Sequence, residues 1–401
     1  MNRDRNDTHL ISEKGIKDSG YLQIILKNYY MKILYSCLSK SWGGMEMITL
    51  IFIRKLIERN YHVELLCAEE SRMQIEANNL GIIIHPVKAS GYVHPFTILK
   101  IASLIKNNNY DLVHTQASKD LWLLVPALKI ISSHIPLFLT KQMGSFIVKK
   151  DFLHKFLYQR ITIAFAISTI IKNNLIETTP LPANKIELLY NAVDVKKFDP
   201  ASADRNKVRK EFNINDDEIV IGMIARFSPG KGHEEFLQSA KTLSTKYRNL
   251  KFIVVGEASR GEDEYANSIK ILAEKLGLKN ILFAGFRSDT PNVLSAFDIF
   301  IFPSHAEAFG IALIEAMSME KASVCANADG VLDIAVDGET NLLFQNKNAE
   351  DLAGKTEQLI NDESKRLQMG KAARQRVIDK FDIEVIMNRT IEFYKNCTNK
   401  N

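Results

Sequence analysis

Short apolar segments alternate with amphipathic segments along most of the chain after residue 30. The amphipathic segments predict helices, for example at residues 46–59, 96–107 and 119–131. The apolar segments predict a first series of strands at residues 32–37, 62–67, 81–86, 111–114, 137–140 and 164–167. They predict a second series at residues 219–225, 252–256, 281–284, 299–302 and 322–325. Strands that alternate with helices indicate parallel sheets with right-handed crossovers.

The two series predict an α/β protein with two doubly wound, Rossmann-like domains. A near-continuous apolar strand such as 219–225 fits a sheet that helices cover on both faces. The pattern breaks at 191–200, so we place the domains at 31–197 and 198–383. Residues 1–30 are polar and lack a clear period, and we expect them to be a loose extension or the product of an upstream start.

The size and composition of the chain agree with two soluble domains. A chain of 401 residues exceeds what one hydrophobic core usually serves. The longest apolar candidate, 161–171, is well short of the roughly 18 residues that span a membrane, and the N-terminus lacks the pattern of a signal peptide. Cys37 and Cys67 lie in apolar strands without a CxxC pair, which indicates buried free thiols in a reducing compartment. We therefore expect a cytoplasmic protein.

Charge is distributed unevenly along the chain. Residues 31–197 contain 20 Lys and Arg against 12 Asp and Glu, a net charge of +8, whereas residues 198–401 contain 27 against 31, a net charge of −4. A basic first domain favours an anionic partner, such as a phospholipid surface or an acidic acceptor. The alternative is a scatter of cations over solvated helix faces. We expect no nucleic-acid partner.

The strongest chemical signal is the segment 307–317, directly after the expected strand 299–302. Glu307 lies in the loop, Gly310 is expected to start a helix, and Glu315 then falls in its second turn. The amides at this helix start are suited to an anion or to sugar hydroxyls. A carboxylate is suited to accept hydrogen bonds from the paired hydroxyls of a ribose or hexose. The alternative is a solvated glutamate before an ordinary amphipathic helix.

Two further loops also follow strands. Arg226 and Lys231 flank a Pro-Gly turn that opens a helix, and two cations at a helix start suit a diphosphate. Gly43 and Gly44 allow a backbone to approach a ligand closely. The alternatives are two solvated cations and a plain tight turn. Neither loop has Walker or GxGxxG spacing.

Three motifs together resemble glycosyltransferase family 4, the retaining enzymes of GT-B fold: Gly-Gly-x-Glu at 43–46, Arg-x4-Lys at 226–231 and Glu-x7-Glu at 307–315. The resemblance spans residues 31–397 in family order and implies two domains that face each other across a deep cleft. The end of the chain resembles the closing helix of the family, so we expect residues 384–401 to cross back to the first domain.

The resemblance implies roles for individual residues. Glu307, which would contact the transferred sugar, and His114, at the end of a first-domain strand, would be the catalytic residues. Arg226 and Lys231 would hold the donor diphosphate, with Gly44 against the phosphates and sugar.

The sugar and nucleoside of the donor would meet further residues of the second domain. Glu315 would bind the ribose, and the backbone around Phe286 and Arg287 would meet the base. The residues that bind the sugar and ribose would be Glu307, Phe309, Gly310, Ile311 and Glu315.

The chain departs from the family pattern in four places. A His-x-His motif ends here in Gln116, and an Arg-His pair is replaced by Lys141 and Gln142. A Gly-Gly-x-x-Glu motif appears as residues 329–333, and Asn341 occupies a position where glycine is expected. The first two departures lie on the acceptor side, so the alternative that His114 is a structural strand-end residue stays open.

The implied reaction moves a hexose-type sugar from a nucleoside-diphosphate sugar, with UDP or GDP favoured, to a glycan or lipid-linked acceptor in cell-surface polysaccharide or lipopolysaccharide synthesis. No side-chain nucleophile is evident, which favours attack on the leaving-group face with retention. We expect no cofactor and no metal, because the sequence has no DxD in a suitable loop. The alternatives are a sugar-nucleotide epimerase or phosphorylase of the same fold, and a non-catalytic sugar-nucleotide-binding protein.

Residues 146–160 mix aromatic and basic side chains. They suit an interfacial helix that docks on anionic lipid, which would make the protein peripherally membrane-associated on the cytoplasmic face. The alternative, which we favour from the sequence, is that Phe152 and Phe156 pack in the core while the lysines are solvated.

Overall fold

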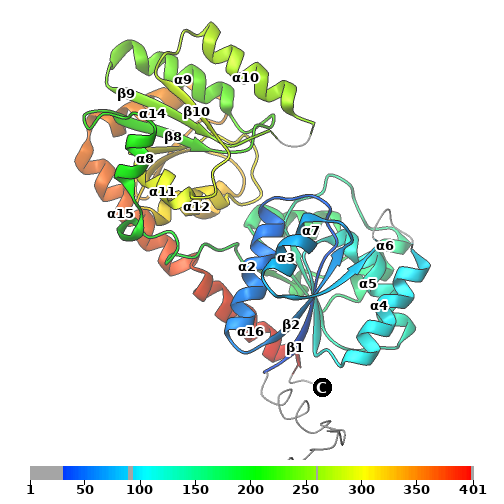
Figure 1. Ribbon diagram of the computed structural model, residues 1–401. Coiled ribbons are helices and arrows are strands. Elements are labelled where there is room, and N and C mark those ends of the chain that lie inside the picture. The colour runs from blue at the N-terminus through cyan, green and yellow to red at the C-terminus, as the bar shows by residue number, and fades with distance from the viewer. Residues whose placement is uncertain (1–29, 89–93, 259–260, 399–401) are drawn as a thin grey trace, which may run out of the picture.

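The computed structural model describes residues 30–88, 94–258 and 261–398, and the expectation for the N-terminal extension lies outside the described residues. Two parallel sheets, one in each half of the chain, form the framework of two domains (Figure 1). The seven-stranded sheet has the order β3-β2-β1-β4-β5-β6-β7. Its strands are β1 Lys32–Cys37, β2 His62–Ala68, β3 Ile83–Val87, β4 Leu112–Thr115, β5 Leu137–Lys141, β6 Ile163–Ala166 and β7 Ile186–Leu188.

The six-stranded sheet of the second domain has the order β10-β9-β8-β11-β12-β13. Its strands are β8 Ile219–Ile224, β9 Leu250–Val255, β10 Ile281–Gly285, β11 Ile299–Phe302, β12 Ala322–Ala326 and β13 Asn341–Phe344. In both sheets the strand order reverses beside the first strand of the domain, β1 or β8, which is the doubly wound arrangement. The two-domain α/β fold that the sequence predicts is therefore confirmed.

Helices cover both faces of each sheet, as parallel strands require. In the first domain these are α2 Gly44–Glu58, α3 Arg72–Asn79, α4 Pro95–Asn108, η1 Ser118–Asp120, α5 Leu121–Ile130, α6 Phe152–Gln159, α7 Thr169–Thr178 and η2 Ala183–Lys185. In the second domain they are η3 Pro200–Ser202, α8 Arg205–Glu211, α9 His233–Lys246, α10 Asp263–Lys275, α11 Thr290–Ala296, α12 Ile311–Ser318, α13 Val331–Ile334, α14 Ala349–Asn361 and α15 Glu363–Lys380.

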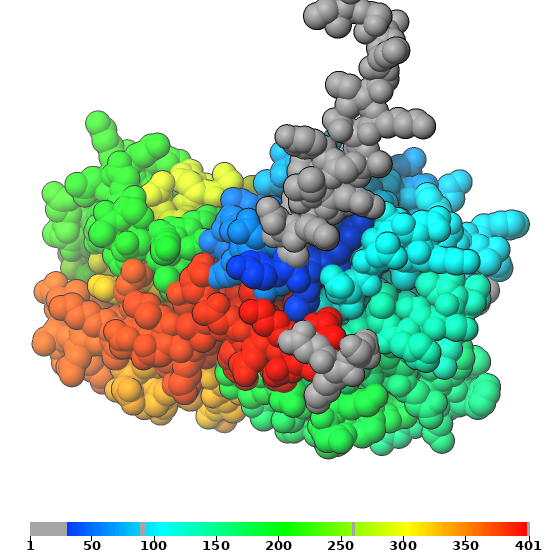
Figure 2. Space-filling view, turned by 90° about the horizontal axis from the view of Figure 1, so that it is seen from below, coloured from blue at the N-terminus to red at the C-terminus, as the bar shows by residue number. Residues whose placement is uncertain are grey.

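The last helix, α16 Ile383–Thr398, packs against the first domain after α15 has run along the second (Figures 1 and 2). Its Tyr394 lies in the aromatic core around β1 and β5, with its ring centroid 4.9 Å from that of Phe138. The two crossings between the domains pair with each other, because the Val193 amide donates to the Phe381 carbonyl and the Ile383 amide donates to the Val193 carbonyl, both over 2.9 Å.

The structure also contains elements that the sequence pattern missed. β7 is only three residues long, and β13 directly follows a turn at Gly338, so neither leaves a clear run of apolar residues. The expected helix at 119–131 begins as the short 3-10 turn η1 and continues as α5. Cys37 and Cys67 are buried and unbridged, as expected. In the described residues, no helix is both long and apolar enough to cross a membrane.

The segment between β5 and the end of α6 contradicts the favoured prediction that its aromatic residues pack in the core. Phe152 is 81% exposed and Phe156 is 40% exposed, while Leu157 and Tyr158 supply the buried face of α6. Asp151 caps the helix by accepting hydrogen bonds from the amides of residues 153 and 154. The helix is therefore formed as the pattern predicts, but among the described residues nothing covers Phe152 and Phe156.

Candidate functional site

Three loops meet at the carboxyl edge of the second sheet, where open parallel sheets bind ligands. They follow β8, β11 and β12, and backbone hydrogen bonds join them. The His305 amide donates to the Gly230 carbonyl over 2.8 Å, and the Gly330 amide donates to the Glu307 carbonyl over 2.9 Å. The loops that carry Lys231 and Glu307 therefore form one connected surface.

Lys231 and Glu307, which the sequence places 76 residues apart, form an ion pair in this surface. The Lys231 ammonium lies 2.6 Å from a Glu307 carboxylate oxygen, and about a fifth of each side chain is exposed. Lys231 directly precedes Gly232, the N-cap of α9, so its ammonium lies beside the positive end of a helix dipole. The Glu307 carboxylate therefore holds the Lys231 ammonium in place at the start of α9, where it can bind an anion.

Glu315 projects from the second turn of α12, whose N-cap is Gly310 with φ of 120°. Phe309 and Gly310 are buried, and Ile311 is partly buried. Burial raises the pKa of the Glu315 carboxyl to about 7, although the positive charge of Lys197 acts to lower it. No described residue makes a hydrogen bond to this carboxylate. It can therefore accept hydrogen bonds from a ligand.

We predict that nucleotide-sugar binding tightens as the pH rises from about 6 to about 8. If Glu315 accepts ribose hydroxyls, the ionised form binds better than the protonated form, so binding is linked to loss of its proton and the dissociation constant should change by up to about tenfold per pH unit below pH 7. Titration calorimetry at several pH values measures this slope. Glu315→Gln should remove the slope, whereas Glu320→Gln, at an exposed position after α12, should keep it. An equal slope in wild type and Glu315→Gln would contradict the role of Glu315.

The remaining second-domain candidates lie on neighbouring loops. Arg226 is exposed directly after β8, and Phe286 is exposed directly after the edge strand β10. The Arg287 guanidinium is bound by two carboxylates, with hydrogen bonds to Asp289 of 2.8 and 2.9 Å and an ion pair to Glu211. The Arg287 side chain is therefore already engaged, and the expected contact of the backbone at 286–287 with a base stays a prediction.

The first domain reaches this surface at several points. A Cβ built on Gly44 would lie 3.4 Å from the Ile311 side chain, so the Gly-Gly loop abuts the start of α12. Asp333 accepts hydrogen bonds from the Thr169 amide over 2.8 Å and from its hydroxyl over 2.6 Å. The Tyr190 ring stacks on Phe309 at 5.8 Å between centroids. Gly44 and Ile311, predicted from different motifs, are thus brought together.

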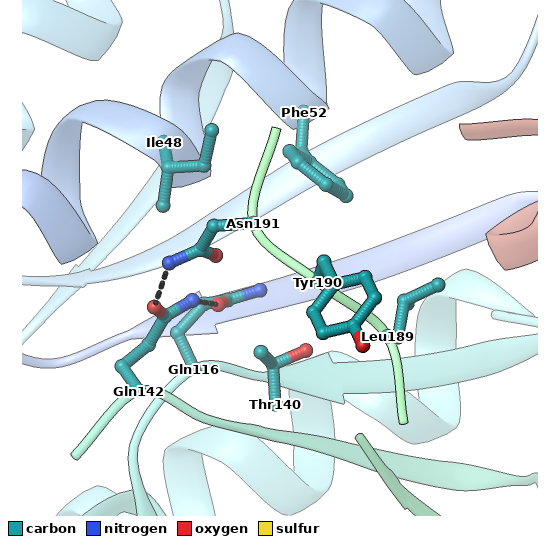
Figure 3. Close-up of a pocket in the computed structure, with 8 residues that line it drawn as sticks. All are labelled: Ile48, Phe52, Gln116, Thr140, Gln142, Leu189, Tyr190 and Asn191. Atoms are coloured by element: carbon teal, nitrogen blue, oxygen red, sulfur yellow. Dashed lines mark hydrogen bonds between the residues drawn. The ribbon is translucent and has the colours of Figure 1, made fainter. Parts of the chain in front are cut away.

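An amide chain links the two residues at which the first domain departs from the expected pattern. The Asn191 amide group donates to the Gln142 side-chain oxygen, and that of Gln142 donates to the oxygen of Gln116, both over 3.0 Å (Figure 3). With Ile48 and Thr140, these residues line a small pocket at the carboxyl ends of β4 and β5. The two substitutions are therefore coupled through a hydrogen bond between neutral amides.

His114 lies elsewhere. Its ring is 1% exposed, and its two nitrogens are bonded to the hydroxyls of Tyr394 and Thr140. Burial lowers the pKa of the imidazole to about 3, so it stays neutral at physiological pH. Tyr394 of α16 closes it off from solvent. This geometry favours the structural alternative, and it does not bring His114 to the site with Glu307.

Sequence reasoning missed the residues that join the domains. Ser168 and Thr169 stand at the start of α7, directly after β6, a position at which a polar pair signals a helix N-cap and also faces the ligand edge of the sheet. Tyr190 directly precedes residues 191–200, where the pattern of strands and helices breaks. Among the residues that the structure describes, no three His, Cys, Asp or Glu side chains group as a metal site.

Comparison with protein families gives two matches. The second domain matches the family described as "Glycosyl transferases group 1" over residues 204–376. The first domain matches "Glycosyltransferase Family 4" over residues 42–197. Together the matches span both domains and contain every residue of the connected surface.

Individual relatives agree with these families. The chain is 30% identical over 231 residues to the capsular polysaccharide biosynthesis glycosyltransferase CapM of Staphylococcus aureus, a match that spans 57% of this chain and 60% of that protein, so less than two thirds of that relative's length. It is 28% identical over 376 residues to the N,N'-diacetylbacillosaminyl-diphospho-undecaprenol alpha-1,3-N-acetylgalactosaminyltransferase of Campylobacter jejuni, covering 89% of this chain and 97% of that protein. Among solved structures, a glycosyltransferase from Rickettsia africae superposes with a TM-score of 0.85 at 25% identity, over 93% of this chain and all of that one.

Proposed function

Because this chain belongs to the glycosyl transferases group 1 family and is thus a glycosyltransferase, we propose that it moves a hexose-type sugar from a nucleoside-diphosphate sugar to a lipid-linked or glycan acceptor in the synthesis of a cell-surface polysaccharide. The observation that carries the proposal is the contact between Lys231 and Glu307, because a cation for the diphosphate and a carboxylate for the adjoining sugar would have to lie side by side. UDP or GDP is the carrier, and the reaction needs no bound cofactor.

The proposed donor site stabilises the negative charge of the leaving nucleoside diphosphate. Arg226 and Lys231 bind the diphosphate, and the amides at the start of α9 and α12 point at it. Glu307 holds the transferred sugar and Glu315 the ribose. The residues that line the pocket at the amide chain include no carboxylate that could attack the sugar. The acceptor hydroxyl therefore attacks on the leaving-group face, the departing phosphate takes its proton, and configuration is retained.

The test is a screen for donors followed by analysis of the product. Thermal unfolding with UDP, GDP and ADP sugars should show one carrier that stabilises the protein, by about 2.7 kcal/mol at 100 times its dissociation constant. Transfer from that donor should give a product with the anomeric configuration of the donor in its NMR spectrum. An inverted product would contradict retention. Conversion of the donor to an epimer, phosphorolysis, or binding without turnover across acceptors would contradict the transferase assignment.

We also propose that the first domain docks on an anionic membrane through the exposed apolar residues of segment 143–156. These residues, which we call the apolar segment, are Met143, Phe146, Ile147, Val148, Phe152, Leu153 and Phe156. Backbone contacts fix the segment, since the Ser145 amide donates to the Asn174 side chain over 2.8 Å. Lys150 and Lys155 lie among these side chains, which gives the combination of apolar and basic groups that anionic bilayers bind.

Replacing Phe146 and Phe152 together with serine should weaken binding to phosphatidylglycerol-containing vesicles by about 10²–10⁴-fold, because each buried Phe contributes about 1.5–3 kcal/mol. Vesicle co-sedimentation measures the change. Phe96→Ser is the matched control, because Phe96 is 89% exposed on α4 and lies outside the segment. Equal vesicle binding by the double variant and the wild type would show that the membrane is not the partner of this surface.

A further inference from the structure

Lys141 occupies an unusual position for a cation. It is the last residue of β5, at the carboxyl edge of the first sheet, and it directly precedes Gln142 of the amide chain. Its ammonium donates a hydrogen bond to the Ser118 hydroxyl over 3.0 Å. In residues 30–88, 94–258 and 261–398, no Asp or Glu pairs with this ammonium. A largely buried cation without a carboxylate lacks the partner that normally offsets its desolvation.

A second cation, Lys149, lies near the first. Burial, and to a smaller extent the positive charge of Lys149, lower the pKa of Lys141 to about 8. Burial also lowers the pKa of Lys149, for which the described residues again provide no carboxylate. Its backbone is held in place, since the Lys149 amide donates to the Thr178 carbonyl over 2.6 Å. The fold therefore keeps two like charges close together and partly dehydrated, an arrangement that an anion would stabilise.

The surroundings indicate what kind of anion fits. On one side, Gln142 leads to Gln116 and Asn191, whose neutral amides suit the hydroxyls of a sugar. On the other side, Lys149 belongs to the same loop as the apolar segment, with Phe146 and Val148 exposed beside it in the sequence. A ligand that fits both sides has an anionic centre between a sugar and a hydrocarbon chain.

We propose that Lys141, Lys149 and Ser118 bind the phosphate or diphosphate of a lipid-linked acceptor, with its hydrocarbon chain along the apolar segment and its sugar at the amide chain. This inference rests on the proposed function, because it names the acceptor class of that transfer. The donor diphosphate has its own cations, Arg226 and Lys231, in the other domain. The proposed acceptor site with Lys141 and Lys149 and the proposed donor site with Arg226 and Lys231 therefore bind different substrates.

The test uses geranyl diphosphate, a short soluble isoprenyl diphosphate, as the probe. Titration calorimetry is done on the full chain carrying Arg226→Ala and Lys231→Ala, which disables the donor site for diphosphates. In that background the probe should still bind. Lys141→Met and Lys149→Met should each weaken binding by about tenfold or more, the loss expected of a charge-assisted hydrogen bond. Lys129→Met, the same change at an exposed position in the last turn of α5, should bind as the background does.

Two results would overturn the proposal. One is unchanged affinity for geranyl diphosphate in Lys141→Met and Lys149→Met. The other is loss of phosphatidylglycerol vesicle binding in these variants with unchanged affinity for the probe, which would make the pair a contact for bilayer headgroups. Lys141→Arg keeps the charge and should keep binding, so a loss caused by misfolding is separable. The titration contains no donor, so it decides on the lysine pair even if nucleotide-sugar transfer fails.

Discussion

Replacing Lys231 with alanine is expected to lower kcat/KM for sugar transfer by about 10²–10³-fold, the range seen when one donor to a developing negative charge is removed. The charge on the diphosphate grows as the bond to the sugar breaks, so a cation at this position contributes more in the transition state than in the ground state. Glu307 holds the Lys231 ammonium at 2.6 Å, and Lys231 stands at the start of α9. Most of the loss should therefore fall on kcat.

Lys246→Ala provides the matched control. Lys246 is the last residue of the same helix, and it forms an exposed ion pair with Glu357 at 2.9 Å. Lys246→Ala removes the same kind of side chain from the other end of α9. Because an exposed ion pair contributes little to stability, this variant should keep its fold and change kcat/KM less than twofold. Steady-state kinetics on both variants, with thermal unfolding to confirm the fold, makes the comparison. A loss of only a few fold in Lys231→Ala would show that Lys231 does not stabilise the leaving group.

The contact between Lys231 and Glu307 could be predicted from the sequence because its determinants are local. Lys231 and Glu307 each follow an apolar strand of a parallel sheet, and the carboxyl ends of such strands share one edge. Gly310 and the helical period place Glu315 in the second turn of α12 before any tertiary contact is known. Regular geometry therefore brings Lys231 and Glu307 into contact and sets Glu315 on the helix that follows the Glu307 loop.

The burial of His114 could not be predicted from the sequence, because Tyr394, whose hydroxyl bonds to its ring, lies 280 residues away along the chain. The prediction that Phe152 and Phe156 pack in the core was wrong for a related reason. Periodicity shows that α6 has an aromatic face, but whether that face is buried depends on a neighbouring element, and here α6 uses Leu157 and Tyr158 instead. The contact between Gln116 and Gln142 is also non-local, so the sequence shows two separate departures where the structure shows one hydrogen-bonded pair.

Replacing Gly232 with alanine should strongly destabilise the second domain and the donor site with it. Gly232 is the N-cap of α9 and has φ of 78°, a conformation that costs an alanine about 1–2 kcal/mol. A Cβ at this position would also lie 2.2 Å from the Pro303 carbonyl oxygen, which belongs to the backbone of the loop that leads to Glu307. Backbone cannot rotate away as a side chain can, so one of the two loops must move.

Gly230→Ala separates the two contributions, because Gly230 has nearly the same φ, 83°, but its added Cβ would meet nothing within 4 Å. Gly230→Ala should lower the free energy of unfolding only by the cost of the backbone conformation, whereas Gly232→Ala should lower it by about 2–3 kcal/mol more because of the clash. In a domain of this size the extra loss lowers the melting temperature by roughly 4–12 °C. Because the clash separates Lys231 from Glu307, kcat/KM should also fall about 100-fold in Gly232→Ala, the effect of a displacement of about 1 Å at a reacting centre. Equal melting temperatures and equal kinetics in the two variants would mean that the close approach of Gly232 to Pro303 does not hold the two catalytic loops together.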